Sequence, residues 1–215
     1  MGLPELIANY GPLYLTTWRI TAVSFVLVMA LSILITVLRV CPFKPLRFFG
    51  DFYVQVFRNI PGAVLILIVV YALPHLKLVL DYEPSVVLCT VLLGASFGSE
   101  NFMTGINTIG VGQIEAARSL GLSFGKILRT IVIPQALRST VLPMTNLFIA
   151  VMLTTALGSQ VPMTPQELTG VVTYINTRES AGIVTFFVSA AGYISTALVA
   201  GFVGNAIDKK VRVIR

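Results

Sequence analysis

The sequence predicts an all-α integral membrane protein with five transmembrane helices, from its composition and from its apolar pattern. Of its 215 residues, 56% are hydrophobic and only 11% are charged, and the mean hydropathy is +0.89. Because a soluble domain carries about 25% charged residues, this chain cannot cover itself with a hydrated surface. Five stretches are also apolar over the roughly 20 residues that a helix needs to cross a bilayer core.

The predicted spans follow from these stretches in chain order. They cover residues 13–38, 61–80, 85–108, 139–158 and 182–207, within a single transmembrane domain of residues 1–215. Pro74 interrupts the second span, and a polar Gly-Ser-Glu-Asn group that contains Glu100 interrupts the third. This pattern is typical of a multi-pass protein of the plasma or inner membrane.

The distribution of Lys and Arg predicts the orientation of the spans. Of the 15 basic residues, 12 lie between spans one and two, between spans three and four, or after span five. Cytoplasmic loops carry such an excess, so we expect the amino terminus outside and the carboxyl terminus in the cytoplasm. The net charge of +6 is spread between apolar runs and forms no water-facing patch, which excludes a nucleic-acid partner.

Two of the predicted cytoplasmic segments have patterns of their own. Residues 45–59 alternate basic and aromatic side chains, which predicts an amphipathic helix lying in the lipid interface, either with a further role or as a simple anchor. The segment 110–137 is too long for a turn and too patterned for a linker, so it is the first place to look for function.

Residues 112–121 read as a short helix. Glu115 is expected in its first turn, where the helix dipole favours an acid. Gly121 stands where a left-handed residue would end the helix. One modest apolar stripe recurs at three-residue spacing: Ile114, Ala117, Leu120.

A second helix is expected to begin at Ser123, a plausible N-cap, and to be broken by Pro134 before the fourth span. The sequence therefore predicts two short helices joined by a glycine hinge. Such a loop can be a lever docked on a partner protein or a solvated connector, and the pattern alone leaves both open.

The identity of these residues resembles a known family. Glu115-Ala116-Ala117, then Gly121, then Ile131 and Ile133-Pro134 resemble the EAA motif of permease subunits of binding-protein-dependent ABC importers. Phe57-Arg58-Asn59-Ile60-Pro61 is similar to a signature of the polar amino acid branch of this family. The sequence around Gly105-Ile106-Asn107-Thr108 is similar to that of glutamate-type permeases.

The resemblance implies a transport mechanism and a set of partners. The loop would be a coupling helix that rests on a cytoplasmic ABC ATPase dimer, and that dimer would use ATP and Mg²⁺. Glu115 would make the polar contact, Ala116 and Ala117 would allow close packing, and Gly121 would fix the turn. The other implied partners are membrane lipid, a second and different permease subunit, and an extracellular or periplasmic amino acid-binding protein.

The residues themselves predict that this chain is not an enzyme and binds no cofactor or metal. The approach to a phosphate-binding loop, Gly121–Ile127, has three residues where four are needed before Gly-Lys, and no hydroxyl follows Lys126. His75 has no second ligand at metal spacing. No nucleophile–base pair is evident in the sequence.

Three polar residues within the predicted spans are candidates for the substrate pathway: Glu100, Thr154 and Thr155. A carboxylate at membrane depth should face the bundle or a water-filled route. Glu100 can therefore line the route, or it can be a structural pair that fixes span three against a partner subunit. The resembled family often has cations where Met103 and Leu153 stand here, so we expect this subunit to be the less substrate-engaged half of a heterodimer.

Two further functions remain open from the sequence: an ion-coupled secondary carrier, and a non-transporting scaffold that recruits a partner through the same loop. Residues 160–180 are expected as an outer segment, either a contact for a binding protein or a plain surface loop. Small residues in span five predict close helix packing: Gly192, Gly201 and Gly204 among them.

Overall fold

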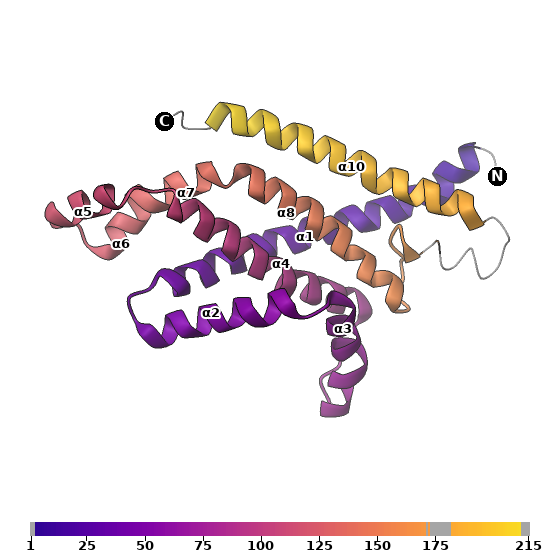
Figure 1. The fold of residues 1–215 in the computed structure, drawn as a ribbon. Coiled ribbons are helices and arrows are strands. Elements are labelled where there is room, and N and C mark those ends of the chain that lie inside the picture. The colour runs from indigo at the N-terminus through magenta and orange to yellow at the C-terminus, as the bar shows by residue number, and fades with distance from the viewer. Residues whose placement is uncertain (1–2, 171, 173–181, 212–215) are drawn as a thin grey trace.

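The computed structural model describes residues 3–170, 172 and 182–211, and the regular secondary structure in this part of the chain is all helical (Figure 1). Its elements are α1 (Leu3–Val40), α2 (Lys44–Asn59), α3 (Gly62–Leu67), the π-turn η1 (Ile68–Ala72), the 3₁₀ turn η2 (Leu73–Leu76), α4 (Tyr82–Asn107), α5 (Val111–Ser119), α6 (Phe124–Ile127), the π-turn η3 (Leu128–Val132), α7 (Ile133–Ser139), α8 (Val141–Thr154), the 3₁₀ turn η4 (Thr155–Gln160) and α10 (Gly182–Val211).

Four helices in the described ranges are long and apolar enough to cross a membrane. They are Tyr10–Val40, Tyr82–Asn107, Val141–Gln160 and Ile183–Val211. A fifth crossing exists if α2 and the α3–η2 segment count as one broken span, and these two are bent by 99° against each other. The all-α membrane fold is therefore confirmed, with four or five spans.

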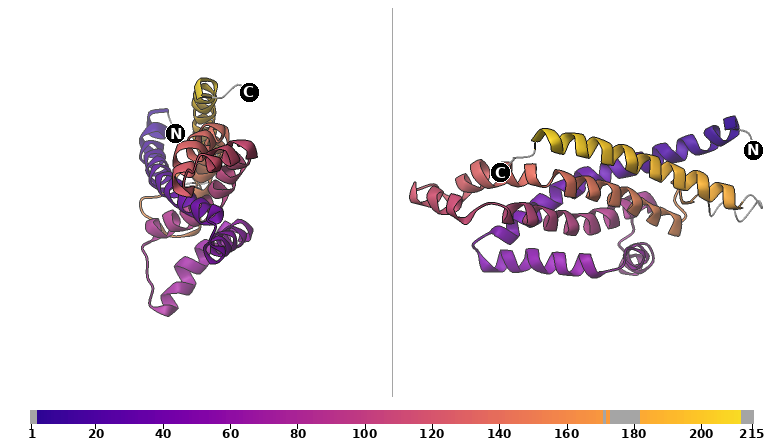
Figure 2. Two further views of the ribbon diagram at one scale, coloured as in Figure 1. Left: turned by 90° about the vertical axis from the view of Figure 1, so that its left-hand side faces the viewer. Right: turned by 45° about the horizontal axis from the view of Figure 1, so that its top comes forward.

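The structure moves the second predicted span. The stretch expected to cross at residues 61–80 is helical only over Gly62–Leu76 and projects from the bundle as a right-angled arm, seen end-on in the right view of Figure 2. The segment expected in the lipid interface, α2, instead runs lengthwise beside α1 and α4. Tyr53 and Val54 are buried there, and the Tyr53 hydroxyl donates to the Leu92 carbonyl at 2.8 Å.

Prolines follow the π-turns η1 and η3. Pro134 has no backbone N–H, so the carbonyl four residues earlier loses its usual donor. The helix widens into the π-turn η3 before the proline and then continues as α7, so the expected break at Pro134 does not occur. Pro74 likewise follows the π-turn η1, but the helical segment there ends two residues later, at Leu76.

The centre of the bundle is the contact between α1 and α4. The inward face of α1 carries small hydroxyl residues, all buried: Thr17, Thr21, Ser24, Ser32 and Thr36. Opposite them, a Cβ on Gly98 would overlap the Ser32 hydroxyl, and one on Gly94 would lie 2.7 Å from Val28. Small side chains thus let α1 and α4 approach each other closely, as is usual between membrane helices.

The last helix, α10, lies against α8 (Figure 1). A Cβ on Gly204 would overlap Thr145, and one on Gly192 would meet Leu168 at 3.0 Å, which confirms both as close-approach positions. Gly201 has nothing within 4 Å in the described part of the chain, so it is not a close-approach position between these helices. It occupies a different face of the helix from the contact.

The segment after η4 is buried, which sequence reasoning did not foresee. Val161, Met163 and Leu168 are at most 4% exposed and pack among the spans, and Glu167 is fully buried. The Glu167 carboxylate accepts the Thr169 and Gly170 amides and the Tyr193 hydroxyl. The described part of this expected outer segment is therefore no plain surface loop, while Arg178 and Glu179 lie outside the described residues.

Candidate functional site

The first candidate site is the two-helix elbow, residues 110–139, at one end of the bundle. It comprises α5, a turn, and α6 to α7, and the end of α10 lies at the same end of the molecule, which we call the elbow end (Figure 1). Within the elbow, the Gln135 side-chain amide donates to the Gln113 side chain at 2.9 Å and joins its two arms.

Gly121 forms the turn of the elbow, as the sequence predicts. Its φ is +75°, a conformation that costs side-chain-bearing residues free energy. The Gly121 N–H donates to the Arg118 carbonyl at 2.8 Å, and the Leu122 N–H donates to the Ala117 carbonyl at 3.1 Å. This pair of bonds is the Schellman motif, which satisfies carbonyls left open at the end of α5.

The two faces of α5 differ from the expected stripe. Ala117 is 3% exposed and packs inside the elbow with Ile109, Ile127 and Val132. Leu120 is 80% exposed, because α5 ends at Ser119 and the turn directs the next side chain outward. The expectation that Ala117 and Leu120 share one face is therefore wrong.

Glu115 and Ala116 are exposed on the outer side of α5. Glu115 lies at the middle of α5, which begins at Val111, so it is not in the first turn as expected. In the part of the chain that the structure describes, its carboxylate forms no ion pair. The elbow thus presents a free acid beside a small residue.

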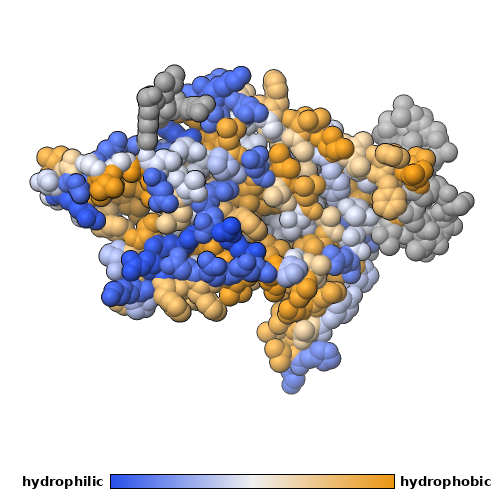
Figure 3. Space-filling model, in the orientation of Figure 1, coloured by the Kyte–Doolittle hydropathy of each residue, from blue (hydrophilic) through white to orange (hydrophobic). Residues whose placement is uncertain are grey.

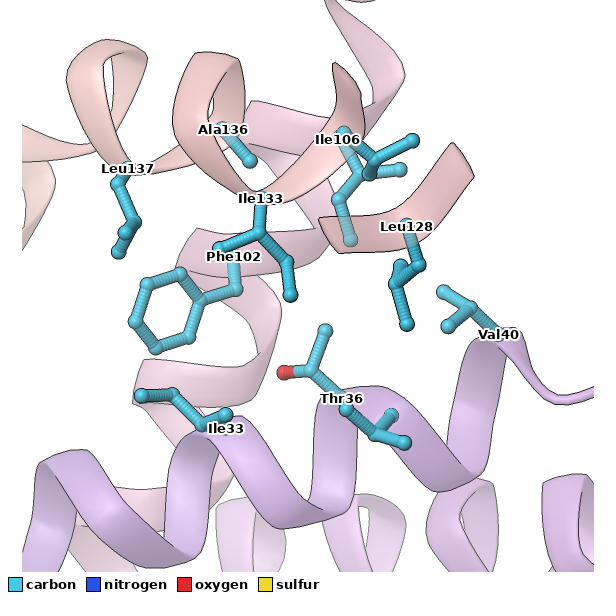
Figure 4. A pocket seen from close by; sticks show the side chains of 11 residues that line it. Ile33, Thr36, Val40, Phe102, Ile106, Leu128, Ile133, Ala136 and Leu137 are labelled. Atoms are coloured by element: carbon cyan, nitrogen blue, oxygen red, sulfur yellow. The ribbon is translucent and has the colours of Figure 1, made fainter. Parts of the chain in front are cut away.

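The elbow meets the spans at an apolar crevice of about 70 Å³ (Figure 4). Side chains from α1, α4 and the η3–α7 segment point into it, among them Ile33, Phe102 and Ile133. The Thr36 hydroxyl at its edge is already used, because it donates to the Ser32 carbonyl at 2.6 Å. The other lining side chains are apolar, so the spans and the elbow meet here by side-chain packing.

The second candidate site is a cavity of about 520 Å³ between α2–α3, α4 and α8–η4. Most of its lining is apolar, and the polar side chains that line it are Arg58, Thr154 and Gln160. Arg58 is the one charged residue among the described residues that line it. Its guanidinium lies 5.5 Å from the centre of the Phe97 ring, a cation–π contact. Figure 3 shows hydrophilic residues gathered along the neighbouring α2 and a largely hydrophobic arm beyond it.

Glu100 belongs to an ion-pair network within its own chain that includes Arg58 of the cavity lining. Its Oε1 accepts from Arg39 Nη2 at 2.9 Å and lies 3.5 Å from Arg58 Nη1. Arg39 also pairs with Asp51 at 2.9 Å, and a Cβ on Gly50 would lie 2.7 Å from the Arg39 side chain. The network therefore ties α1, α2 and α4 together, with two cations and two acids in balance.

The two threonines expected in the pathway are separated by the structure. Thr154 lines the cavity, although its hydroxyl also donates to the Ala150 carbonyl at 2.8 Å. Thr155 is fully buried and donates to the Met152 carbonyl at 2.7 Å, and it is not part of the cavity lining.

Comparison with known proteins identifies the family. Residues 27–213 match the family described as binding-protein-dependent transport system inner membrane component. The chain belongs to this family. It is therefore an inner membrane permease, and the secondary-carrier and scaffold alternatives no longer apply.

Relatives and solved structures agree with this. The permease is 32% identical to the glutamate transport system permease protein GluC of Corynebacterium efficiens, over 98% of this chain and 99% of that one. It is 28% identical to the arginine transport system permease protein ArtQ of Bacillus subtilis, over 91% and 89%. Its fold is similar to that of an amino acid ABC transporter chain at a TM-score of 0.84 and 22% identity, over 95% of this chain and 96% of that one.

As the transmembrane component, the permease is not the catalytic subunit. ATP is used by a partner ATPase, and the permease itself holds no cofactor. Among the described residues no group of three His, Cys, Asp or Glu side chains could hold a metal ion.

Sequence reasoning missed two cations of the membrane site. Arg39 and Arg58 were counted with the basic loops, because each stands at the edge of a predicted span. The signal that could have found them was the lone acid: Glu100 at membrane depth favours a cation within reach. Arg58 also stands within the Phe-Arg-Asn-Ile-Pro signature.

Proposed function

We propose that this permease carries a polar amino acid, with glutamate as the first candidate, into the cell and is driven through its elbow by a cytoplasmic ABC ATPase dimer. The observation that carries the proposal is the free outer face of α5, where Glu115 and Ala116 are exposed beside the rigid Gly121 turn. The amino acid is suggested by the relatives, which are described as permeases for glutamate and arginine.

The elbow is suited to transmit force for physical reasons. The Schellman turn and the Gln113–Gln135 bond hold its two arms as one body. Glu115 would pair with a basic group of the ATPase, and Ala116 is small enough to let the ATPase surface approach the backbone. Ala117, buried inside the elbow, would hold the arms together and would not touch the ATPase.

Adjacent alanines provide a matched test of this coupling. In a background lacking Cys41 and Cys89, Ala116→Cys and Ala117→Cys are compared for oxidative cross-linking to single cysteines on the ATPase surface. We expect cross-links from position 116 and none from position 117. Glu115→Lys should also lower the ATPase activity that the binding protein stimulates. Equal cross-linking at both positions, or none at either, would contradict the coupling proposal.

We further propose that substrate passes by way of the α2–α4–α8 cavity. Arg58 would receive a substrate carboxylate, Thr154 would supply a polar contact, and Glu100 would hold Arg58 in place. Because the cavity offers one cation, a second permease subunit would complete the recognition of an amino acid. The apolar arm, with Val64, Leu67 and Tyr71 exposed, would pack against that subunit.

The pathway proposal is tested with two arginines of α2. Arg58→Gln should raise the KM for glutamate uptake into proteoliposomes by about 10-fold or more, since a charged hydrogen bond contributes about 1.5–3 kcal/mol. Arg47→Gln, at the other end of α2 and outside the cavity, should leave uptake unchanged. An unchanged KM for Arg58→Gln would exclude this route.

A further inference from the structure

A second large cavity lies on the side of the bundle formed by α1, α8 and α10. It is about 530 Å³, and no charged side chain is among the described residues that line it. Its walls include Met29 of α1, Met144 of α8, and Val203 and Ile207 of α10. Its walls do not include α2 or the arm, so it is separate from the proposed substrate route.

The length of this groove corresponds to one leaflet of a bilayer. Along α7 and α8 it extends from Leu137 to Phe148, which at 1.5 Å per residue is about 16 Å. Half of a bilayer core is about 15 Å. At the Phe148 end of the groove, the ring of Phe148 contacts the rings of Phe25 and Trp18, with centres 5.1 and 6.1 Å apart. The groove is therefore as long as one acyl chain of a single leaflet.

Two cationic side chains lie near the Leu137 end of the groove. Arg138 lies in the last turn of α7, between Leu137 and Thr140, and both of those residues line the groove. Lys210 follows Ile207 by one turn on the lining face of α10, whereas Lys209 points to the opposite face and Asp208 to the flank. Neither Arg138 nor Lys210 forms an ion pair within the described part of the chain.

We propose that this groove is a binding site for an anionic phospholipid, with one acyl chain between α1, α8 and α10 and the phosphate between Arg138 and Lys210. The antiparallel contact of Thr145 with Gly204 brings the two cations to the same end of the groove. Basic groups where transmembrane helices meet the membrane surface bind anionic headgroups in this way. The site ties α10 to the base of the elbow through a lipid.

The test is native mass spectrometry of the assembled transporter with phosphatidylglycerol and phosphatidylcholine of the same chain length. Each cation near the headgroup contributes about a factor of five, so Arg138→Gln with Lys210→Gln should weaken phosphatidylglycerol binding about 25-fold. The matched control, Arg129→Gln with Lys209→Gln, removes the same charge away from the groove and should leave binding unchanged.

A second pair of variants tests the acyl chain. Ala200→Phe fills the groove and should abolish retention of the lipid, whereas Leu198→Phe, on the exposed face of α10, should have no effect. Equal binding of the two lipids, equal loss in both charge variants, or unchanged binding by Ala200→Phe would overturn the proposal. A disulfide from Val203→Cys to the partner permease would overturn it too, because a protein would then occupy the groove.

Discussion

At the scale of single residues, the elbow depends on one glycine. Gly121 has a φ of +75° and nothing within 4 Å of its Cβ position, so the backbone and not crowding requires glycine there. Gly125, four residues on in α6, also has open space around it but has ordinary helical backbone. The two positions therefore separate backbone strain from any other effect of added side-chain volume.

We expect Gly121→Ala to destabilise the turn by about 1–2 kcal/mol, the cost of a left-handed conformation for an L-residue. Hydrogen exchange at the Leu122 amide, which closes the turn, should become faster. Gly125→Ala should leave this amide unchanged, or protect it slightly because alanine favours the helix. Similar exchange in wild type and Gly121→Ala would mean that the turn does not need glycine.

A second residue-scale prediction concerns the pH dependence of stability. Burial raises the pKa of the Glu167 carboxyl above its ordinary value of 4.5, and the hydrogen bonds from Thr169, Tyr193 and Gly170 offset part of this rise. A raised folded-state pKa means that the contribution to stability is fully present below the unfolded-state pKa. It is lost as the pH rises through the folded-state pKa.

The unfolding temperature of wild type in detergent should therefore fall relative to that of Glu167→Gln as the pH is raised from about 4 toward neutrality. Glu115→Gln, on the exposed elbow, serves as the control and should follow wild type. Parallel pH profiles for wild type and Glu167→Gln would show that Glu167 does not titrate in this range.

At the scale of elements, glycines decide how closely the helices approach. Composition indicates that small residues pack membrane helices but not which ones do so. Gly98 faces Ser32 across the α1–α4 contact, whereas Gly201 of α10 has open space around it. This difference depends on which face of each helix meets a neighbour, and α10 has a contact on only part of its surface.

Gly98→Ala should destabilise the permease by about 1–3 kcal/mol, because the added methyl overlaps the Ser32 hydroxyl and α4 must move away from α1. Gly201→Ala should be neutral or slightly stabilising. Thermal unfolding in detergent with a fluorescent thiol probe at Cys89 measures both variants. Equal midpoints would contradict the tight α1–α4 contact.

At the scale of the whole molecule, the distribution of basic side chains predicts the orientation in the membrane. The elbow end carries Arg118, Lys126, Arg138 and the last basic residues of α10, while the loop before α4 carries Lys77. By the positive-inside rule, we expect the elbow end to face the cytoplasm.

Single cysteines in a cysteine-free background test this arrangement in intact cells. Lys77→Cys should react with a membrane-impermeant maleimide, and Gly125→Cys should react only after the membrane is opened. The reverse pattern would place the elbow outside and exclude contact with a cytoplasmic ATPase.

The sequence by itself determined the membrane class, four of the spans, the glycine turn and the family resemblance. These are properties of local composition and spacing, because apolar length sets a span and a left-handed turn needs glycine. Only the tertiary structure decided that α2 belongs to the bundle, that Glu100 pairs with Arg39 and Arg58, that Ala117 faces inward and that Glu167 is buried. Each of these depends on contacts between residues that are distant in the sequence and lie on different helices. The apolar periodicity within one helix does not specify which other helices pack against it.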